Sequence, residues 1–301
     1  MKKFVLKVLL FFTCVVVMDY AFGQFFSYLR AHAKGGSTAN CEYIANRANE
    51  DIIILGSSRA THHYVPQIIE DSLGLSCYNC GEEGNGVILA YGRLKMLTNR
   101  YKPKLILYEI TSGYDYELFE ANTKYLGYLR QYYDKEGIKE LFDDFDDELS
   151  SLKMKSKMYQ NTSRLLPNLL DNAIMRDNHQ GYDPLYGHLD SLSVADHKVK
   201  NMNIDSLKLG YVEKILKLAQ SKEIPVIFMI SPRYHYGDDM SEYEPATQLC
   251  EKYGVRVINN VNESSIAPYA SLFQDVTHLN DSGARLYSQL FVRQLKECIN
   301  L

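Results

Sequence analysis

A serine, a histidine and an aspartate in two distant segments have the residue types and spacing of a hydrolase triad. Ser58 lies in the stretch Gly56-Ser57-Ser58-Arg59, and Asp275-Val276-Thr277-His278 lies near the C-terminus. Acyl transfer needs a hydroxyl nucleophile, a base that takes its proton and a group that orients the base. An aspartate three residues before a histidine can reach the imidazole and fix its tautomer. We therefore predict Ser58 as the nucleophile, with Ser57 the less favoured choice, His278 as the base and Asp275 as its partner.

These residues must be positioned by strands that alternate with helices. Short apolar runs predict five buried strands, and most segments between them have the apolar spacing of helices. The strands are expected at residues 51–55, 75–79, 105–108, 224–230 and 255–258. This alternation predicts an α/β domain with an open, mostly parallel sheet covered on both faces, whose working residues lie on loops at the carboxyl ends of the strands.

Residues 114–205 lose this periodicity. A structureless loop of that length would be abnormal inside a compact domain, so we predict a largely helical insertion within a domain of residues 51–301. Many of the 24 tyrosines cluster between Tyr101 and Tyr133. They could line a sugar-binding surface, although exposed loops are also often rich in tyrosine without binding a ligand.

The N-terminal segment has the pattern of an export signal or a membrane anchor. Lys2, Lys3 and Lys7 precede an apolar run from Val8 to Met18, and such basic residues keep this end in the cytoplasm. One alternative is a signal peptide cleaved near residues 21–23, which would release a secreted protein. The other is an uncleaved, single-pass anchor over residues 1–29, followed at 30–50 by a linker that leads into a short helix. We favour the anchor, in a bacterial inner membrane with the domain in the periplasm, because apolar residues continue beyond the potential cleavage site.

Charge and cysteine usage exclude some functions. The net charge of -4, with no long basic run, does not provide the positive surface that nucleic-acid binding needs. Cys77 and Cys80 have a metal-like spacing, but no second Cys or His pair accompanies them, so we predict neither a metal nor a cofactor. Cys250 and Cys298 could form a disulfide in an oxidising compartment.

Three short blocks resemble those of the SGNH superfamily, the GDSL-type esterases and lipases. The family's Gly-Asp-Ser-like block is matched by residues 56–58, its Asn-x-Gly-x-x-Gly block by 79–84, and its Asp-x-x-His block by 275–278. The resemblance covers residues 51–112 and 206–299 and implies a three-layer, flavodoxin-like sandwich. A serine in the middle of the first block resembles membrane-anchored bacterial members associated with cell-envelope polymers.

The resemblance also implies an oxyanion hole and substrate contacts. The backbone N–H groups of Ser58 and Gly84 would point into the hole. The family's third block supplies an Asn donor in a Gly-x-Asn-Asp run, but this chain has Glu-Ile-Thr-Ser-Gly at residues 109–113, so Asn85 is the candidate replacement. Arg59 could contact an anionic substrate or pair with a local carboxylate. Arg233 and His235 follow the fourth strand and are candidates to line the cleft, whereas His62 and His63 are expected at the surface.

Together these patterns predict an exported serine esterase or O-acyltransferase that acts, without a cofactor, on acyl groups such as acetyl on a cell-surface glycan. Two other functions stay open. The chain could be a non-catalytic binding or assembly component of an envelope-polysaccharide system, in agreement with the missing third-block Asn. It could also be a lipase or lysophospholipase.

Overall fold

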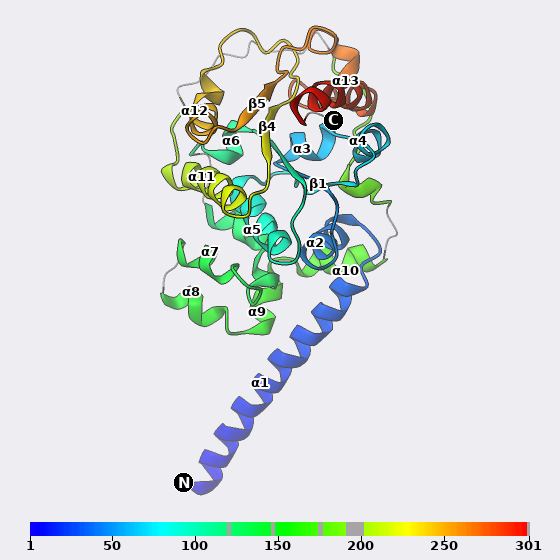
Figure 1. The fold of residues 1–301 in the computed structure, drawn as a ribbon. Coiled ribbons are helices and arrows are strands. Elements are labelled where there is room, and N and C mark those ends of the chain that lie inside the picture. The colour runs from blue at the N-terminus through cyan, green and yellow to red at the C-terminus, as the bar shows by residue number, and fades with distance from the viewer. Residues whose placement is uncertain (119–121, 146–147, 174–176, 191–201, 300–301) are drawn as a thin grey trace. The chain divides into compact units, whose positions relative to one another are not determined.

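The chain forms two compact units. The structure, a computed structural model, describes residues 1–118, 122–145, 148–173, 177–190 and 202–299 (Figure 1). Unit 1 contains Met1–Arg47 and Asn122–Asp177, and unit 2 contains Ala48–Ala121 and Asn178–Leu301. The predicted insertion at 114–205 therefore contributes its middle part, residues 122–177, to the unit that also holds the N-terminus.

Unit 2 is built on one parallel sheet. Within the described residues the sheet has five strands in the order β2-β1-β3-β4-β5, which is the order of flavodoxin-like folds. All neighbouring strands run parallel, as predicted. The strands are β1 (Ile52–Leu55), β2 (Cys77–Asn79), β3 (Leu105–Glu109), β4 (Val226–Ile230) and β5 (Arg256–Asn259).

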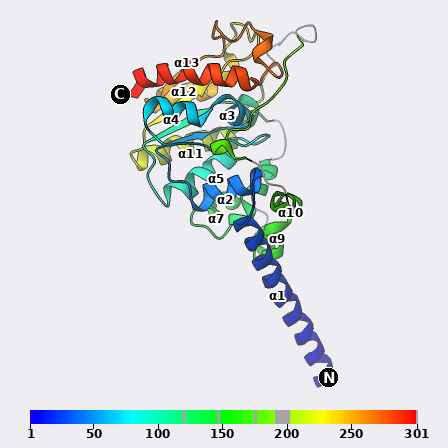
Figure 2. The same ribbon diagram turned by 90° about the vertical axis from the view of Figure 1, so that its right-hand side faces the viewer.

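Helices cover both faces of this sheet and complete a three-layer sandwich (Figure 2). On one side α13 (Asp281–Ile299) packs against α3 (Ser58–His63) and α4 (Pro66–Leu73). On the other side α11 (Ser206–Ser221) packs against α5 (Val87–Thr98) and α12 (Glu244–Lys252). Shorter elements are α6 (Ser112–Asp115), η3 (His179–Gly181), η5 (Ser241–Tyr243) and η6 (Ala270–Leu272).

The central strands are apolar on both faces because helices cover both faces. Ile52 and Ile54 point into the core beside α3, α4 and α13, whereas Ile53 points the other way, and all three side chains are fully buried. Such continuous runs of β-branched residues are typical of parallel strands. The same burial accounts for much of the tyrosine cluster, since Tyr108 and Tyr116 are fully buried and serve the core.

Unit 1 is helical. Its elements are α1 (Lys2–Ala31), α2 (Gly36–Asn46), η1 (Asn122–Tyr128), η2 (Arg130–Tyr132), α7 (Lys139–Asp143), α8 (Glu148–Lys153), α9 (Lys157–Thr162) and α10 (Leu165–Ala173). The short helix expected within residues 30–50 is α2. Among the described helices, α1 alone is long and apolar enough to cross a membrane, a property that an N-terminal signal sequence shares.

The second half of α1 is packed into unit 1. The Asp19 carboxylate accepts hydrogen bonds from the backbone N–H groups of Lys157 (2.8 Å) and Met158 (3.0 Å) at the start of α9. Gly23 approaches α9 so closely that an added Cβ would lie 2.5 Å from the Lys157 Cβ. By contrast, the side chains of residues 4–18 are exposed.

Candidate active site

Ser58 stands at the turn between β1 and α3, at the carboxyl edge of the sheet. Gly56 makes this turn possible, because its φ is 142° and a Cβ there would lie 2.8 Å from the Glu109 carbonyl oxygen. The two serines that follow have different environments. The Ser57 hydroxyl is buried and donates to Thr111 Oγ1 (2.9 Å), whereas Ser58 Oγ lies 2.8 Å from His278 Nε2. The geometry thus singles out Ser58.

The Asp275–His278 loop is held by its own aspartate. Asp275 Oδ1 accepts from the Thr277 N–H (2.8 Å), the Thr277 hydroxyl (2.8 Å) and the His278 N–H (2.9 Å). Asp275 Oδ2 lies 2.8 Å from His278 Nδ1. An ionised carboxylate only accepts, so Nδ1 carries the proton and Nε2 presents its lone pair to Ser58.

The charge of Asp275 is secured by the same contacts. Partial burial favours the neutral acid, but the hydrogen bond and charge of His278, together with the Thr277 donors, hold the pKa of Asp275 well below its ordinary value. The carboxylate is therefore ionised at neutral pH and can stabilise an imidazolium at His278.

His62 and His63 are both buried next to this triad, so their expected surface positions are wrong. His62 Nδ1 donates to the Asp183 carbonyl (2.6 Å). His63 Nε2 accepts from the Leu279 N–H (3.0 Å), and its Nδ1 donates to Ser231 Oγ (2.8 Å). Burial, with positive neighbours, lowers the pKa of His62 and lowers that of His63 further. The neutral His63 ring thus links α3 to Leu279, the residue that follows His278.

Behind Ser58 lies a buried charge network centred on Glu109, the last residue of β3. Glu109 Oε1 lies 2.9 Å from a terminal nitrogen of Arg59 and accepts from the backbone N–H (3.0 Å) and hydroxyl (2.7 Å) of Ser231. Its Oε2 accepts from the Tyr64 hydroxyl (2.5 Å). Arg59 also donates to the Tyr243 hydroxyl (2.9 Å). Sequence reasoning missed Glu109, Ser231, Tyr64 and Tyr243. For Glu109 and Ser231 a signal was available, because both lie at the ends of strands.

Of the two alternatives expected for Arg59, the structure shows the pairing with a local carboxylate. The Arg59 side chain is 4% exposed and points into the protein, toward Glu109. Burial alone would lower the pKa of Arg59, but Tyr243 and Glu109 raise it above the usual value, so the guanidinium stays charged.

In the part of the chain that the structure describes, no hydrogen bond connects the other predicted substrate-binding and oxyanion residues to Ser58, Asp275 or His278. Arg233 forms an ion pair with Glu242 (2.7 Å) and lies over the Tyr236 ring (4.8 Å). His235 is exposed and has a positive φ of 41°. Among the described residues no hydrogen bond links Gly84 or Asn85 to Ser58, and the Asn85 amide donates to the Glu83 carbonyl (3.0 Å). The oxyanion roles of these groups stay predictions.

The second block supports α3. The Asn79 amide donates to the Ala60 carbonyl (2.7 Å), and its oxygen accepts from the Gly81 N–H (3.0 Å). A Cβ on Gly81 would lie 2.7 Å from the Thr61 nitrogen, so only glycine permits this approach. The block therefore holds the helix that presents Ser58.

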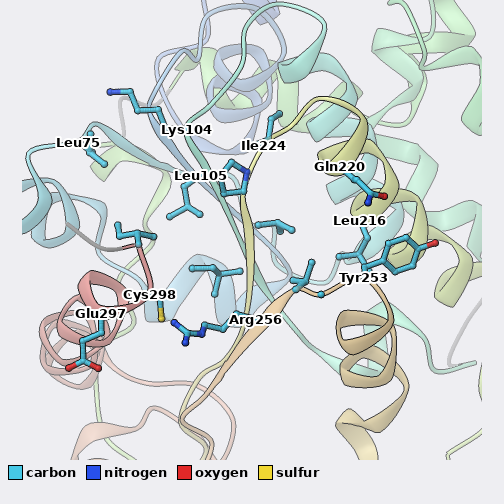
Figure 3. Close-up of a pocket in the computed structure, with 16 residues that line it drawn as sticks. Leu75, Lys104, Leu105, Leu216, Gln220, Ile224, Tyr253, Arg256, Glu297 and Cys298 are labelled. Carbon is cyan, nitrogen blue, oxygen red and sulfur yellow. The ribbon is translucent and has the colours of Figure 1, made fainter.

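A separate hollow of about 840 Å³ opens at the opposite edge of the sheet (Figure 3). Leu105, Val226 and Arg256, at the starts of their strands, line it with Leu216 of α11 and Cys298 of α13. Ligands of open α/β sheets bind at the carboxyl ends of the strands. We therefore place the candidate site at the triad. No disulfide joins Cys250 and Cys298, and the described residues hold no His, Cys, Asp and Glu cluster fit for a metal ion.

Comparisons with known proteins give structural likeness only. No family model matches the chain, and no curated protein matches it. One similar solved structure is titled as a lipolytic protein of the G-D-S-L family from Desulfitobacterium hafniense (9% identity, 81% of this chain and 98% of that chain, TM-score 0.41). Others are a lipase/acylhydrolase from Enterococcus faecalis (13%, 82% and 95%, 0.40) and an acetylxylan esterase from Geobacillus stearothermophilus (14%, 82% and 94%, 0.42). The sheet order, and the place of all three blocks at the carboxyl ends of strands or before the last helix, are those that the resemblance to SGNH hydrolases predicts.

Proposed function

We propose that this chain is a serine esterase or O-acyltransferase of the SGNH type, with Ser58 as nucleophile. The observation that carries the proposal is the 2.8 Å approach of Ser58 Oγ to His278 Nε2, on a ring whose other nitrogen is 2.8 Å from Asp275. Both distances are those of direct hydrogen bonds between a nucleophile, its base and the group that orients the base.

The reaction follows from this arrangement. Ser58 Oγ attacks the ester carbonyl carbon while its proton passes to His278 Nε2. The imidazolium, stabilised by Asp275, then donates that proton to the leaving alkoxide oxygen as the C–O bond breaks, which leaves an acyl-enzyme. Water or a sugar hydroxyl then attacks the acyl carbon and gives its proton to His278 Nε2. His278 returns this proton to Ser58 Oγ as the bond between Oγ and the acyl carbon breaks, which releases the acid or the acylated sugar and restores Ser58.

The substrate we infer is an O-acyl ester, such as an acetyl ester, on a cell-surface glycan. The N-terminal segment has the pattern of an export signal or anchor, and the export that this pattern predicts would place the domain with a substrate outside the cytoplasm. The buried tyrosines of residues 101–133 do not add support for a sugar surface.

The proposed location is the outer side of the cytoplasmic membrane of a bacterium, with α1 retained. The packing of Asp19 and Gly23 on α9 supports retention, because cleavage near residues 21–23 would remove a carboxylate that accepts from two N–H groups of that helix. N-terminal sequencing of the protein purified from membranes tests this. A mature chain that starts after Gly23 would contradict it.

A fluorophosphonate probe tests the chemistry. Wild type and Ser57→Ala should be labelled, although Ser57→Ala removes the hydrogen bond to Thr111 and should slow labelling. Ser58→Ala should not be labelled. Release of acid from p-nitrophenyl esters of increasing chain length then separates an acetyl-specific enzyme from a lipase, and added oligosaccharide separates transfer from hydrolysis.

A non-catalytic binding or assembly component is the second candidate. One observation favours it: the family's third-block Asn is absent, and residues 109–113 read Glu-Ile-Thr-Ser-Gly in its place. Folded wild-type protein that no fluorophosphonate labels and that hydrolyses no ester would support this candidate over the enzyme.

A further inference from the structure

Helix α10 is amphipathic, but its polar side is buried and its apolar side is exposed. Asn168 and Asp171 are its buried residues, at 0% and 6% exposure, yet both are polar. Its leucines form the opposite, exposed face, which we call the leucine face: Leu165, Leu166, Leu169 and Leu170, at 39%, 62%, 42% and 47% exposure. A surface helix in water normally turns its apolar side inward. The medium or partner outside α10 is therefore expected to be apolar.

The buried polar side fixes this orientation. Asp171 Oδ2 accepts from the Thr38 N–H (3.0 Å), and Asn168 Oδ1 accepts from the Thr38 hydroxyl (3.2 Å). Asn172 Nδ2 donates to the Leu29 carbonyl of α1 (2.8 Å). Turning the leucines inward would break these bonds and leave buried polar groups without partners, which is costly. The leucine face therefore points away from unit 1.

The length of the free part of α1 places α10 close to a bilayer. The 15 residues Phe4–Met18 span only ~22 Å of helix, whereas the hydrocarbon core is ~30 Å thick and needs ~20 residues. The membrane must then reach about Gly23, where α9 already packs. Leu29 lies ~9 Å further along the helix, at the depth of the headgroups. This is the residue whose carbonyl accepts from Asn172 of α10. Phe22 and Phe25, on either side of Gly23, are also exposed, at 39% and 50%.

We propose that the leucine face of α10 inserts into the lipid surface of the membrane that α1 spans, in the leaflet reached by the C-terminal end of α1. The occupant is lipid because α10 packs, within unit 1, against a helix suited to a bilayer. An amphipathic helix in such a place buries its apolar side ~5–10 Å into the boundary of headgroups and acyl chains. The inference rests on the proposed retention of α1 as an anchor.

The chain contains no tryptophan, so single substitutions provide clean reporters. Phe11→Trp reports on α1, Leu166→Trp on the leucine face, and Leu286→Trp is the matched control, an exposed leucine (41%) on α13 of unit 2. Leu170→Trp is a second reporter on the leucine face. The full chain is reconstituted into vesicles of phosphatidylcholine and phosphatidylglycerol, with or without bromine on the acyl chains.

Bromine quenches tryptophan by contact. We expect strong quenching of Phe11→Trp and a loss of about half the emission for Leu166→Trp and Leu170→Trp, as suits an interfacial helix. Leu286→Trp should be unaffected. Quenching of Phe11→Trp alone would overturn the inference while leaving the anchor intact, and blue-shifted but unquenched leucine-face reporters would mean that protein, such as a second copy, covers the face. Without quenching of Phe11→Trp, the anchor itself fails, and the inference fails with it.

Discussion

Removing the charge of Glu109 tests whether the network behind Ser58 holds the site together. Glu109→Gln keeps the size of the side chain but leaves the Arg59 guanidinium without its counter-ion. Both side chains are nearly inaccessible, at 0% and 4% exposure. Burial raises the pKa of Glu109, while Arg59, Ser231 and Tyr64 oppose that rise, so we expect the wild-type carboxyl to be ionised beside the charged arginine.

The expected loss is large. Breaking a buried ion pair by removing one partner costs about 3–5 kcal/mol, mostly because the remaining charge is buried and uncompensated. The hydrogen bonds from Ser231 and Tyr64 are weakened by the same change, and each is worth about 1.5–3 kcal/mol when the acceptor is charged. These contributions overlap, so we expect Glu109→Gln to lower the free energy of unfolding by about 3–5 kcal/mol in total.

Urea unfolding of the detergent-solubilised full chain, followed by circular dichroism, measures this loss. The matched control is Glu223→Gln, because Glu223 also pairs with a basic residue, Lys102 (3.4 Å), but is 90% exposed. Exposed pairs contribute little, so the control should unfold like the wild type. A Glu109→Gln protein as stable as the Glu223→Gln protein would refute the reasoning. Slower fluorophosphonate labelling of Ser58 should accompany the loss, since Arg59 is its neighbour in α3.

Three further changes have defined outcomes. Asp275→Asn should slow fluorophosphonate labelling by roughly 10⁴-fold, because the ring at 2.8 Å loses the group that fixes its tautomer; unchanged labelling would show that Asp275 has no such role. Burial lowers the pKa of His63 in the folded chain below its unfolded value of about 6.5. Folding is therefore destabilised as the pH falls below that value, by up to about 2 kcal/mol at pH 5. Unfolding at pH 8 and pH 5 should therefore show a smaller pH effect for His63→Gln than for wild type, and an equal effect would contradict this. Gly181→Ala should destabilise the fold, since its φ is 85° and a Cβ would lie 1.9 Å from a carbonyl oxygen, whereas Gly210→Ala in open space on α11 should stabilise it by up to about 1 kcal/mol; melting temperatures of the two variants compare them directly.

The sheet could be predicted from the sequence because burial on both faces leaves a local pattern. Runs such as Ile52–Leu55 and Val226–Ile230 are apolar without interruption, and the glycines and polar residues that follow them locate the carboxyl edge. The three proposed catalytic residues could be found for a related reason, since each lies on a loop at that edge. Their pairing in space follows from the parallel strand order.

The environment of the site could not be predicted in the same way. Arg59 and His63 belong to one helix, but their partners come from β3, from the end of β4 and from the loop before α13. Nothing in the local pattern around residue 59 distinguishes a guanidinium that faces a substrate from one that faces Glu109. The insertion posed a similar difficulty, because α10 buries amides and carboxylates and exposes leucines. The pattern of α10 is amphipathic, but the rule that the apolar side of a helix faces the core assigns the wrong side to the interior.

The network around Glu109 also bears on whether the protein is an enzyme or a non-catalytic relative of one. Where the family has an oxyanion Asn, β3 ends in a buried carboxylate, and the following Thr111 accepts from Ser57 at the turn before Ser58. Buried ion pairs can often be replaced by apolar side chains without loss of stability. A chain that only had to fold and bind would thus have little need for an arginine, a glutamate and a neutral histidine directly behind its serine. Groups that fix α3 and the loop of His278 to a few tenths of an ångström are, by contrast, what acyl transfer requires. On this reasoning the third segment supports the proposed nucleophile from behind, and the predicted oxyanion hole would rely on backbone donors such as the N–H groups of Ser58 and Gly84.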